Sequence, residues 1–255
     1  MSEPQPAAPP DPFPITAVNG LSPGQKRLVA GAEILLCSSL PTQIVIGGLL
    51  RAAGWSPTTE LDQLSLPFVF ALSLIDTAVL IALMVMLKRT HGQSPSELWL
   101  GHRSPAREVG LGIVLVPLVF LFVGIVMSGL LYLLPGLHNV TANPIEQLAT
   151  GGPRDAAMLG VIAIVAGGIR EELQRAFLLQ RFEQHLGGAA VGVVVLSTAF
   201  GLGHLLQGWD AVITTGLLGA FWAVVYLRRR SSLAPIVSHA GFNSLEVLRV
   251  ALGGS

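Results

Sequence analysis

Long apolar stretches recur along the whole 255-residue chain and limit what it can fold into. Each is about twenty residues long, which is enough for a helix to cross the ~30 Å hydrocarbon core of a bilayer. The chain is 51% hydrophobic and only 12% charged, whereas soluble domains carry roughly a quarter charged residues. These features predict an all-α, polytopic transmembrane helix bundle.

The hydropathy pattern predicts seven spans, or eight if the third hides a short extra element around Pro117. The predicted spans cover residues 28–50, 67–87, 109–134, 156–182, 189–206, 211–227 and 233–252. The order of apolar, polar and proline-rich segments divides the chain into four regions. They are a disordered proline-rich tail (1–27), N-terminal scaffold helices (28–135), a polar linker (136–155) and a second group of helices (156–252).

Basic residues predict the orientation, because cytoplasmic loops carry an excess of Lys and Arg. With the N-terminus in the cytoplasm, most basic residues near the span ends fall on the cytoplasmic side. These are Lys26, Arg27, Lys88, Arg89, Arg103, Arg107, Arg181 and Arg228 to Arg230. Only Arg51 and Arg154 fall in loops on the other side. We therefore expect an integral protein of the plasma (inner) membrane with a cytoplasmic N-terminus.

The segment "GGIREELQRAF" places two adjacent carboxylates, Glu171 and Glu172, in the fourth predicted span. A charged residue deep in a bilayer costs several kcal/mol, so it normally faces the bundle interior and serves a function. In the alternative interpretation, the helix ends at Gly168 and "REELQR" begins an interfacial helix. Glu171 and Arg175, four residues apart, would then form a surface pair worth a few tenths of a kcal/mol.

His204 is predicted to lie at the depth of the two carboxylates. Gly187 and Gly188 indicate a turn between two antiparallel helices. The carboxylates precede this turn by about sixteen residues and His204 follows it by about sixteen, which is ~24 Å of helix in both directions.

The last predicted helix adds His239 and Asn243, which are four residues apart and therefore share one face. The turn before this helix, around Arg230, falls on the same membrane side as the turn at Gly187. We expect the acidic pair, His204 and this second polar pair to meet in the cytoplasmic half of the bundle.

These residue types suit a hydrolase that activates water directly. A carboxylate shielded from bulk water can take a proton from a water molecule, and a histidine can orient that water or share the proton. An asparagine and a second histidine can donate hydrogen bonds to a developing oxyanion. Ser197 and Ser238 read as ordinary helix serines, which disfavours a covalent acyl-enzyme.

Other functions use similar residues. Two histidines and a glutamate can bind zinc, but here they are spread over three helices without an H-E-x-x-H motif. We therefore expect no cofactor, with zinc as the alternative. A nonenzymatic scaffold or immunity protein could use the polar cluster to hold its bundle together. A proton-coupled transporter would show broken helices or repeated halves, which the sequence lacks. The zero net charge and the lack of a dense basic cluster argue against nucleic acid as a partner.

In this order, the three groups resemble the motifs of the CAAX prenyl protease and bacteriocin-processing family of intramembrane glutamic endopeptidases. That family has a Glu-Glu pair followed after three residues by Arg, then Phe-x-x-x-His, then His-x-x-x-Asn. Phe200 to His204 and His239 to Asn243 match the last two motifs in full. The resemblance covers roughly residues 155–250.

The first motif departs from the family pattern, since two residues rather than three separate Glu172 from Arg175. If Arg175 is the family arginine, Arg170 occupies the first glutamate position and Glu171 the second. If the acidic pair is the anchor, Glu171 is the first glutamate, which acts as the base in the family. Glu171 belongs to the pair in both registers and is the favoured base, with Glu172 as the alternative.

The resemblance implies that Glu171 and His204 activate the water, and that His239 and Asn243 stabilise the oxyanion. It also implies a substrate-binding or site-ordering role for Arg175, and we assign the same role to Phe200. The implied partners are the lipid bilayer and a membrane-associated peptide or protein, of CAAX type or resembling a bacteriocin.

Overall fold

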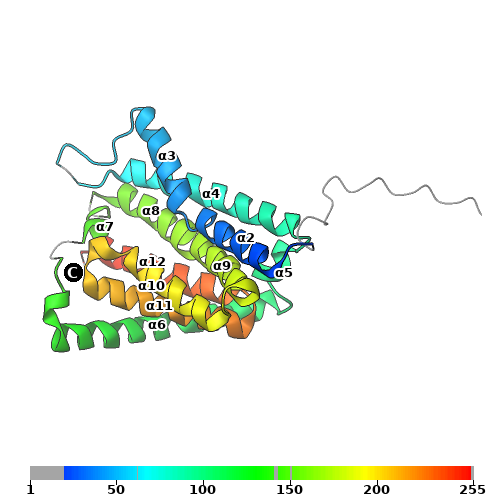
Figure 1. The fold of residues 1–255 in the computed structure, drawn as a ribbon. Coiled ribbons are helices and arrows are strands. Elements are labelled where there is room, and N and C mark those ends of the chain that lie inside the picture. Colours follow the sequence, from blue (N-terminus) through cyan, green and yellow to red (C-terminus); the bar gives the residue numbers. More distant parts are fainter. Residues whose placement is uncertain (1–19, 62, 141–142, 150, 254–255) are drawn as a thin grey trace, which may run out of the picture.

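The computed structural model describes residues 20–61, 63–140, 143–149 and 151–253. These residues form an elongated bundle of helices (Figure 1). Within the described part, the only β pairing is an isolated bridge between Thr58 and Leu64. The predicted all-α fold class is confirmed.

The first predicted span, 28–50, is wrong as a single helix. It consists of α2 (Pro23–Leu36) and α3 (Leu40–Ala52), and α3 turns away from the line of α2 (Figure 1). The chain breaks at Ser39, whose φ of 68° lies in the left-handed region and cannot continue a right-handed helix.

Residues 23–27, predicted to belong to the disordered tail, instead form the start of α2. A capping box explains this start: the Ser22 side chain accepts a hydrogen bond from the Gln25 backbone, and the Gln25 side chain accepts one from the Ser22 backbone. Residues 1–19 of the predicted tail lie outside the described residues.

Three helices follow: α4 (Leu66–Thr90), the short α5 (Pro95–Trp99) and α6 (Pro105–Leu133). Helix α6 runs through Pro117 without ending, so there is no extra element at this position. The linker contains the short helices η1 (Pro135–Leu137) and α7 (Pro144–Gln147).

The segment with the acidic pair is one continuous helical rod. It runs through α8 (Pro153–Ile162), the π-helix η2 (Ala163–Arg170) and α9 (Glu171–His185). The interpretation in which the helix ends at Gly168 is therefore wrong. π-Helical turns are rare in proteins, and those that do occur are frequently found at functional sites.

The remaining elements are α10 (Ala189–Leu202), η3 (Leu205–Gln207), α11 (Trp209–Arg229) and α12 (Leu233–Ala251). Gly187 and Gly188 form the turn between α9 and α10 with φ values of 96° and 94°, which glycine adopts without a steric penalty. Helix α10 ends two residues before His204, so this histidine lies beyond the helix and not within it.

Four segments of the described chain are long and apolar enough to cross a membrane. They are Pro23–Ala52, Leu66–Thr90, Pro105–Leu133 and Trp209–Arg229. The predicted count of seven is therefore only roughly right. The fourth predicted span is interrupted by charged residues, and α10 is apolar but only 14 residues long.

Polar contacts of two basic residues join the ends of three helices at one end of the bundle (Figure 1). Arg230 pairs with Glu183, and Lys88 Nζ donates to Gln180 Oε1 at 2.9 Å. The ends of α4, α9 and α11 therefore lie together.

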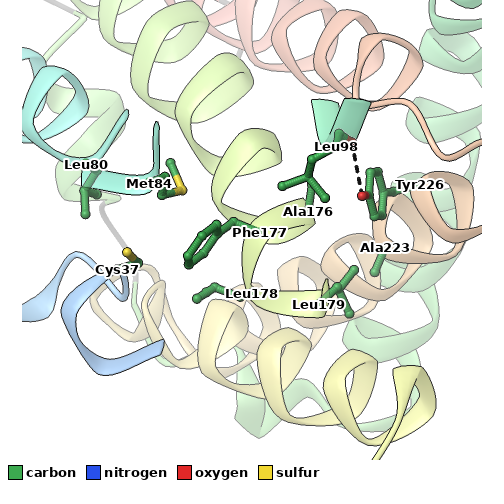
Figure 2. Close-up of a cluster of buried hydrophobic side chains, with 10 residues drawn as sticks. All are labelled: Cys37, Leu80, Met84, Leu98, Ala176, Phe177, Leu178, Leu179, Ala223 and Tyr226. Atoms are coloured by element: carbon green, nitrogen blue, oxygen red, sulfur yellow. Dashed lines mark hydrogen bonds between the residues drawn. The ribbon is translucent and has the colours of Figure 1, made fainter. Parts of the chain in front are cut away.

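Helix α9 is the centre of the largest apolar core (Figure 2). Phe177 and Leu179 of α9 are fully buried, and the same cluster includes Met84 of α4 and Tyr226 of α11. Helix α9, which begins with the acidic pair, is therefore held by helices from both halves of the chain.

Candidate active site

Small residues bring α12 directly against η2. A Cβ atom added to Gly168 would lie 2.5 Å from the Cβ of Ala240, so only a glycine allows this approach. One turn along, the Asn243 side chain lies beside Gly167 and donates to the Ala163 carbonyl at 3.5 Å. This contact places the polar face of α12 beside the start of α9.

Glu172 is the buried carboxylate of the site. It is 2% exposed, and its Oε1 lies 2.8 Å from His239 Nδ1 and also accepts a hydrogen bond from Arg175. An ionised carboxylate only accepts hydrogen bonds, so Nδ1 is the donor. Arg175 and His239 are themselves buried, and the arginine offsets the charge of Glu172.

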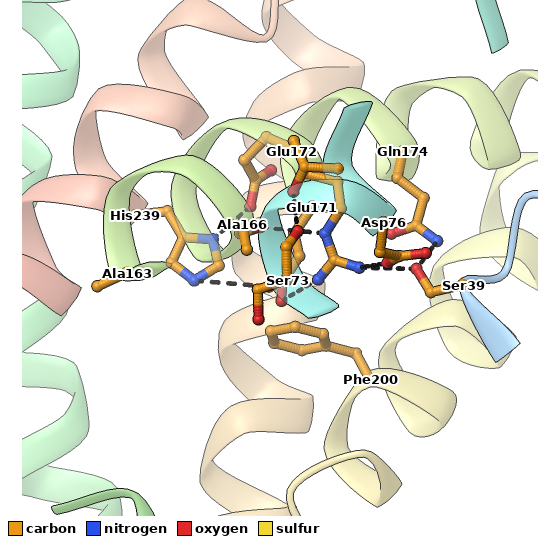
Figure 3. A network of polar contacts seen from close by, with 12 residues as sticks. Ser39, Ser73, Asp76, Ala163, Ala166, Glu171, Glu172, Gln174, Phe200 and His239 are labelled. Atoms are coloured by element: carbon orange, nitrogen blue, oxygen red, sulfur yellow. Dashed lines mark hydrogen bonds and ion pairs between the residues drawn. The ribbon is translucent and has the colours of Figure 1, made fainter. Parts of the chain in front are cut away.

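Glu171 is the more accessible carboxylate, with a side chain that is 21% exposed. Its Oε2 lies 3.9 Å from His239 Nε2, and its Oε1 accepts a hydrogen bond from Arg170 Nη2 at 3.2 Å. His239 therefore lies between the two carboxylates, with one ring nitrogen toward each (Figure 3).

Aromatic rings surround this group. Trp222 stacks on the imidazole of His239 with centroids 3.8 Å apart. Phe200 lies 6.1 Å from the His239 ring, and the Arg175 guanidinium lies 4.9 Å from the Phe200 centroid. The rings shield the buried charges and restrict the imidazole to one orientation.

The structure does not join His204 to the carboxylates. In the described residues, no hydrogen bond or ion pair links it to Glu171 or Glu172. Its Nδ1 contacts the Phe200 carbonyl oxygen at 2.9 Å, and its ring lies 4.9 Å from the Phe200 ring. His204 lies beyond the end of α10 at Leu202. It contacts Phe200, and the Phe200 ring in turn lies near the other candidate residues.

Sequence reasoning missed three residues that contact the acidic pair or its partners. Arg170 was noted only as a register alternative, yet it bonds Glu171, Asp76 and Ser39. Trp222, which stacks on His239, lies in an apolar stretch whose hydropathy does not distinguish it from a packing residue. The isolated Asp76 inside the second apolar span was a signal that could have identified this contact.

The described residues contain no group of three His, Cys, Asp or Glu side chains that could hold a metal ion. The side chains of the site supply proton acceptors and hydrogen-bond donors in a shielded environment. Glu171 and, in the tautomer with its proton on Nδ1, His239 Nε2 both present acceptors.

Comparison with known families confirms the resemblance. Residues 153–245, from α8 into α12, match the family model described as type II CAAX prenyl endopeptidase Rce1-like. This is a protease family, and the match together with the apolar spans supports an integral membrane hydrolase. No curated protein and no solved structure matches the chain.

Proposed function

We propose that this protein is an intramembrane endopeptidase that hydrolyses a peptide bond of a membrane-associated substrate with water activated by Glu171. One observation carries the proposal: a partly exposed carboxylate lies 3.9 Å from the imidazole of His239 inside an otherwise buried polar cluster. A general base must lie within hydrogen-bond reach of the proton that it takes, directly or through one water molecule. The partly exposed Glu171 is open to such a water, and His239 Nε2 lies close enough to its carboxylate for one water molecule to bridge the two.

Glu172 is the residue that orients His239 in this proposal. By accepting the Nδ1 proton, it leaves Nε2 as an acceptor facing Glu171. This division of roles resembles the way a buried carboxylate fixes a catalytic histidine in other hydrolases. His239 thus replaces His204 as the proposed partner of the base.

Asn243 and His204 are the proposed oxyanion donors. The Asn243 amide lies one helical turn from His239, and within the described residues it donates one long hydrogen bond, of 3.5 Å, to the Ala163 carbonyl oxygen. A weakly engaged amide can turn toward a developing negative charge. The ring of His204 lies 4.9 Å from that of Phe200, which in turn lies 6.1 Å from the ring of His239.

The proposed substrate is a peptide anchored in the membrane, with a prenylated CAAX-type protein or a bacteriocin-like peptide as the candidates. We also propose that the basic end of the bundle faces the cytoplasm, with the plasma (inner) membrane as the location. The proposed chemistry uses no metal, so a chelator is expected to leave the rate unchanged.

The test is cleavage by purified protein reconstituted in lipid vesicles. A farnesylated CAAX peptide with a quenched fluorophore is compared with the same peptide lacking the lipid, and with a membrane-anchored peptide without a CAAX sequence. Glu171→Gln should lower kcat by about 100-fold or more while the protein stays folded. Full activity of Glu171→Gln would contradict the assignment of the base, and no cleavage of any peptide by the wild type would contradict the proposed function.

One observation favours a second candidate, a nonenzymatic immunity or scaffold protein. Arg170 occupies the position of the first family glutamate if Arg175 is the family arginine, and it is bound in buried polar contacts. A scaffold predicts that replacement of His239 or Glu172 lowers the melting temperature in detergent and that the wild type cleaves no anchored peptide.

A further inference from the structure

Arg170 joins the N-terminal helices to the candidate base. It is 9% exposed and divides its guanidinium between two sets of partners. Nη1 donates to Asp76 Oδ2 at 2.9 Å and to Ser39 Oγ at 2.7 Å, whereas Nη2 donates to Glu171 Oε1 at 3.2 Å. The two terminal nitrogens therefore point to different elements of the bundle.

The Asp76 end of this contact is rigid. Asp76 is fully buried in α4, and besides Arg170 it accepts hydrogen bonds from Thr42 and from Gln43 at the start of α3. A buried carboxylate held by several donors has little freedom to move. Figure 3 shows Asp76, Ser39 and Gln174 at one side of this network and His239 at the other.

The break between α2 and α3 supplies the other fixed partner. Ser39 adopts a left-handed conformation there, and its hydroxyl oxygen accepts from both Arg170 and Gln174 Nε2. Gln174 also donates to the Cys37 carbonyl oxygen. The break therefore has a defined contact partner on α9, and none of these N-terminal residues lies in the segment 153–245 that matches the family model.

We infer that Arg170, held by Asp76 and Ser39, is a positioning residue that fixes the Glu171 carboxylate so that its second oxygen faces His239. This inference rests on the proposed function and deepens it. Arginine suits the task, because its planar guanidinium can hold two partners in fixed directions, whereas lysine acts as a point charge. The N-terminal helices then contribute directly to the geometry of the site.

The alternative is that Arg170 only neutralises the buried Asp76. The two cases differ in the double variant Asp76→Asn/Arg170→Gln, which removes both charges while preserving shape. If Arg170 positions Glu171, this variant keeps a low kcat even where its melting temperature recovers. If Arg170 serves Asp76 alone, kcat returns to the wild-type value, and the inference is overturned.

The single variants give the expected pattern in vesicles. Arg170→Gln should lower kcat by about 100-fold, the scale on which a misplaced catalytic group costs rate. KM should change by less than about twofold, because the lost contact acts in the chemical step. Arg170→Lys should recover part of kcat. The matched control is Arg230→Gln, which removes the exposed pair with Glu183 at the end of the bundle and should leave kcat unchanged within about twofold.

A second readout keeps the inference distinct from the proposed function. If the wild type cleaves no peptide, the proposed function fails, and the contact is then judged by thermal melting in detergent. Arg170→Gln and Glu171→Gln should be coupled, so that the double variant loses less than the sum of the two single losses. Additive losses would overturn the inference whatever the activity.

Discussion

Glu172 Oε1 and His239 Nδ1 lie 2.8 Å apart, and both side chains are almost completely buried. This contact connects the start of α9 to α12, although the two residues are 67 positions apart in the chain. It fixes which ring nitrogen remains available on the other side of the imidazole.

Glu172→Gln is expected to destabilise the protein more than Glu171→Gln does. The loss of the Glu172 charge leaves Arg175 buried without its acidic partner, which typically lowers the free energy of unfolding by about 3–5 kcal/mol. The Glu171 side chain is partly exposed, so its replacement should cost below about 1 kcal/mol. Thermal melting followed by tryptophan fluorescence in detergent measures the difference. Glu172→Gln/Arg175→Met is the matched control and should recover part of the loss; equal losses in the two single variants would refute this view.

Gly168→Ala is expected to force η2 and α12 apart. Its new Cβ would lie 2.5 Å from Ala240 Cβ and 2.9 Å from Ala240 Cα, and overpacking of this kind costs about 1–3 kcal/mol. Because His239 precedes Ala240 directly, peptide cleavage should fall as well. Gly160→Ala in α8 is the control: no atom lies within 4 Å of its added Cβ, so stability should stay equal or rise by up to about 1 kcal/mol. The idea fails if both variants melt alike.

Trp222 is expected to hold the imidazole of His239 by stacking. Trp222→Ala should cost about 3–5 kcal/mol, because it empties a fully buried site. Trp222→Phe keeps an aromatic face against His239 and loses only the indole hydrogen bond to Ser238 Oγ at 3.3 Å, so about 1 kcal/mol is expected. Melting temperatures and cleavage rates are measured together. A phenylalanine variant as unstable as the alanine variant would show that the hydrogen bond, not the stacking, matters.

The sequence predicted the class of fold and the neighbourhood of the site because both follow from local patterns. Apolar stretches set the helices, and the turn at Gly187 set the register between the acidic pair and α10. The break at Ser39 was not predicted from hydropathy, since apolar residues lie on both sides of it and read as one continuous stretch. The π-helix was missed because its segment, Ala163–Arg170, has the composition of an ordinary apolar helix.

The roles of individual polar residues depended on tertiary geometry that periodicity does not contain. Counting residues from the turn at Gly187 placed His204 at the same depth as Glu171. The count could not reveal that α10 ends at Leu202. Asp76 and Arg170 lie 94 positions apart, and only the packing of α4 against η2 brings them into contact.

Asn243→Ala is expected to lower kcat without a matching loss of stability. In the part of the chain that the structure describes, the Asn243 amide donates one long hydrogen bond, at 3.5 Å to the Ala163 carbonyl, so its removal should cost the folded protein less than about 1 kcal/mol. If the amide instead donates to the oxyanion, its loss should lower kcat by about 100-fold to 1,000-fold. The cleavage rate in vesicles and the melting temperature separate the two effects. Asn243→Asp is the companion variant, since it preserves shape but puts an acceptor where a donor is needed, and it should be at least as inactive as Asn243→Ala. A lower melting temperature with unchanged kcat would assign Asn243 to holding η2 against α12 and remove it from the proposed chemistry.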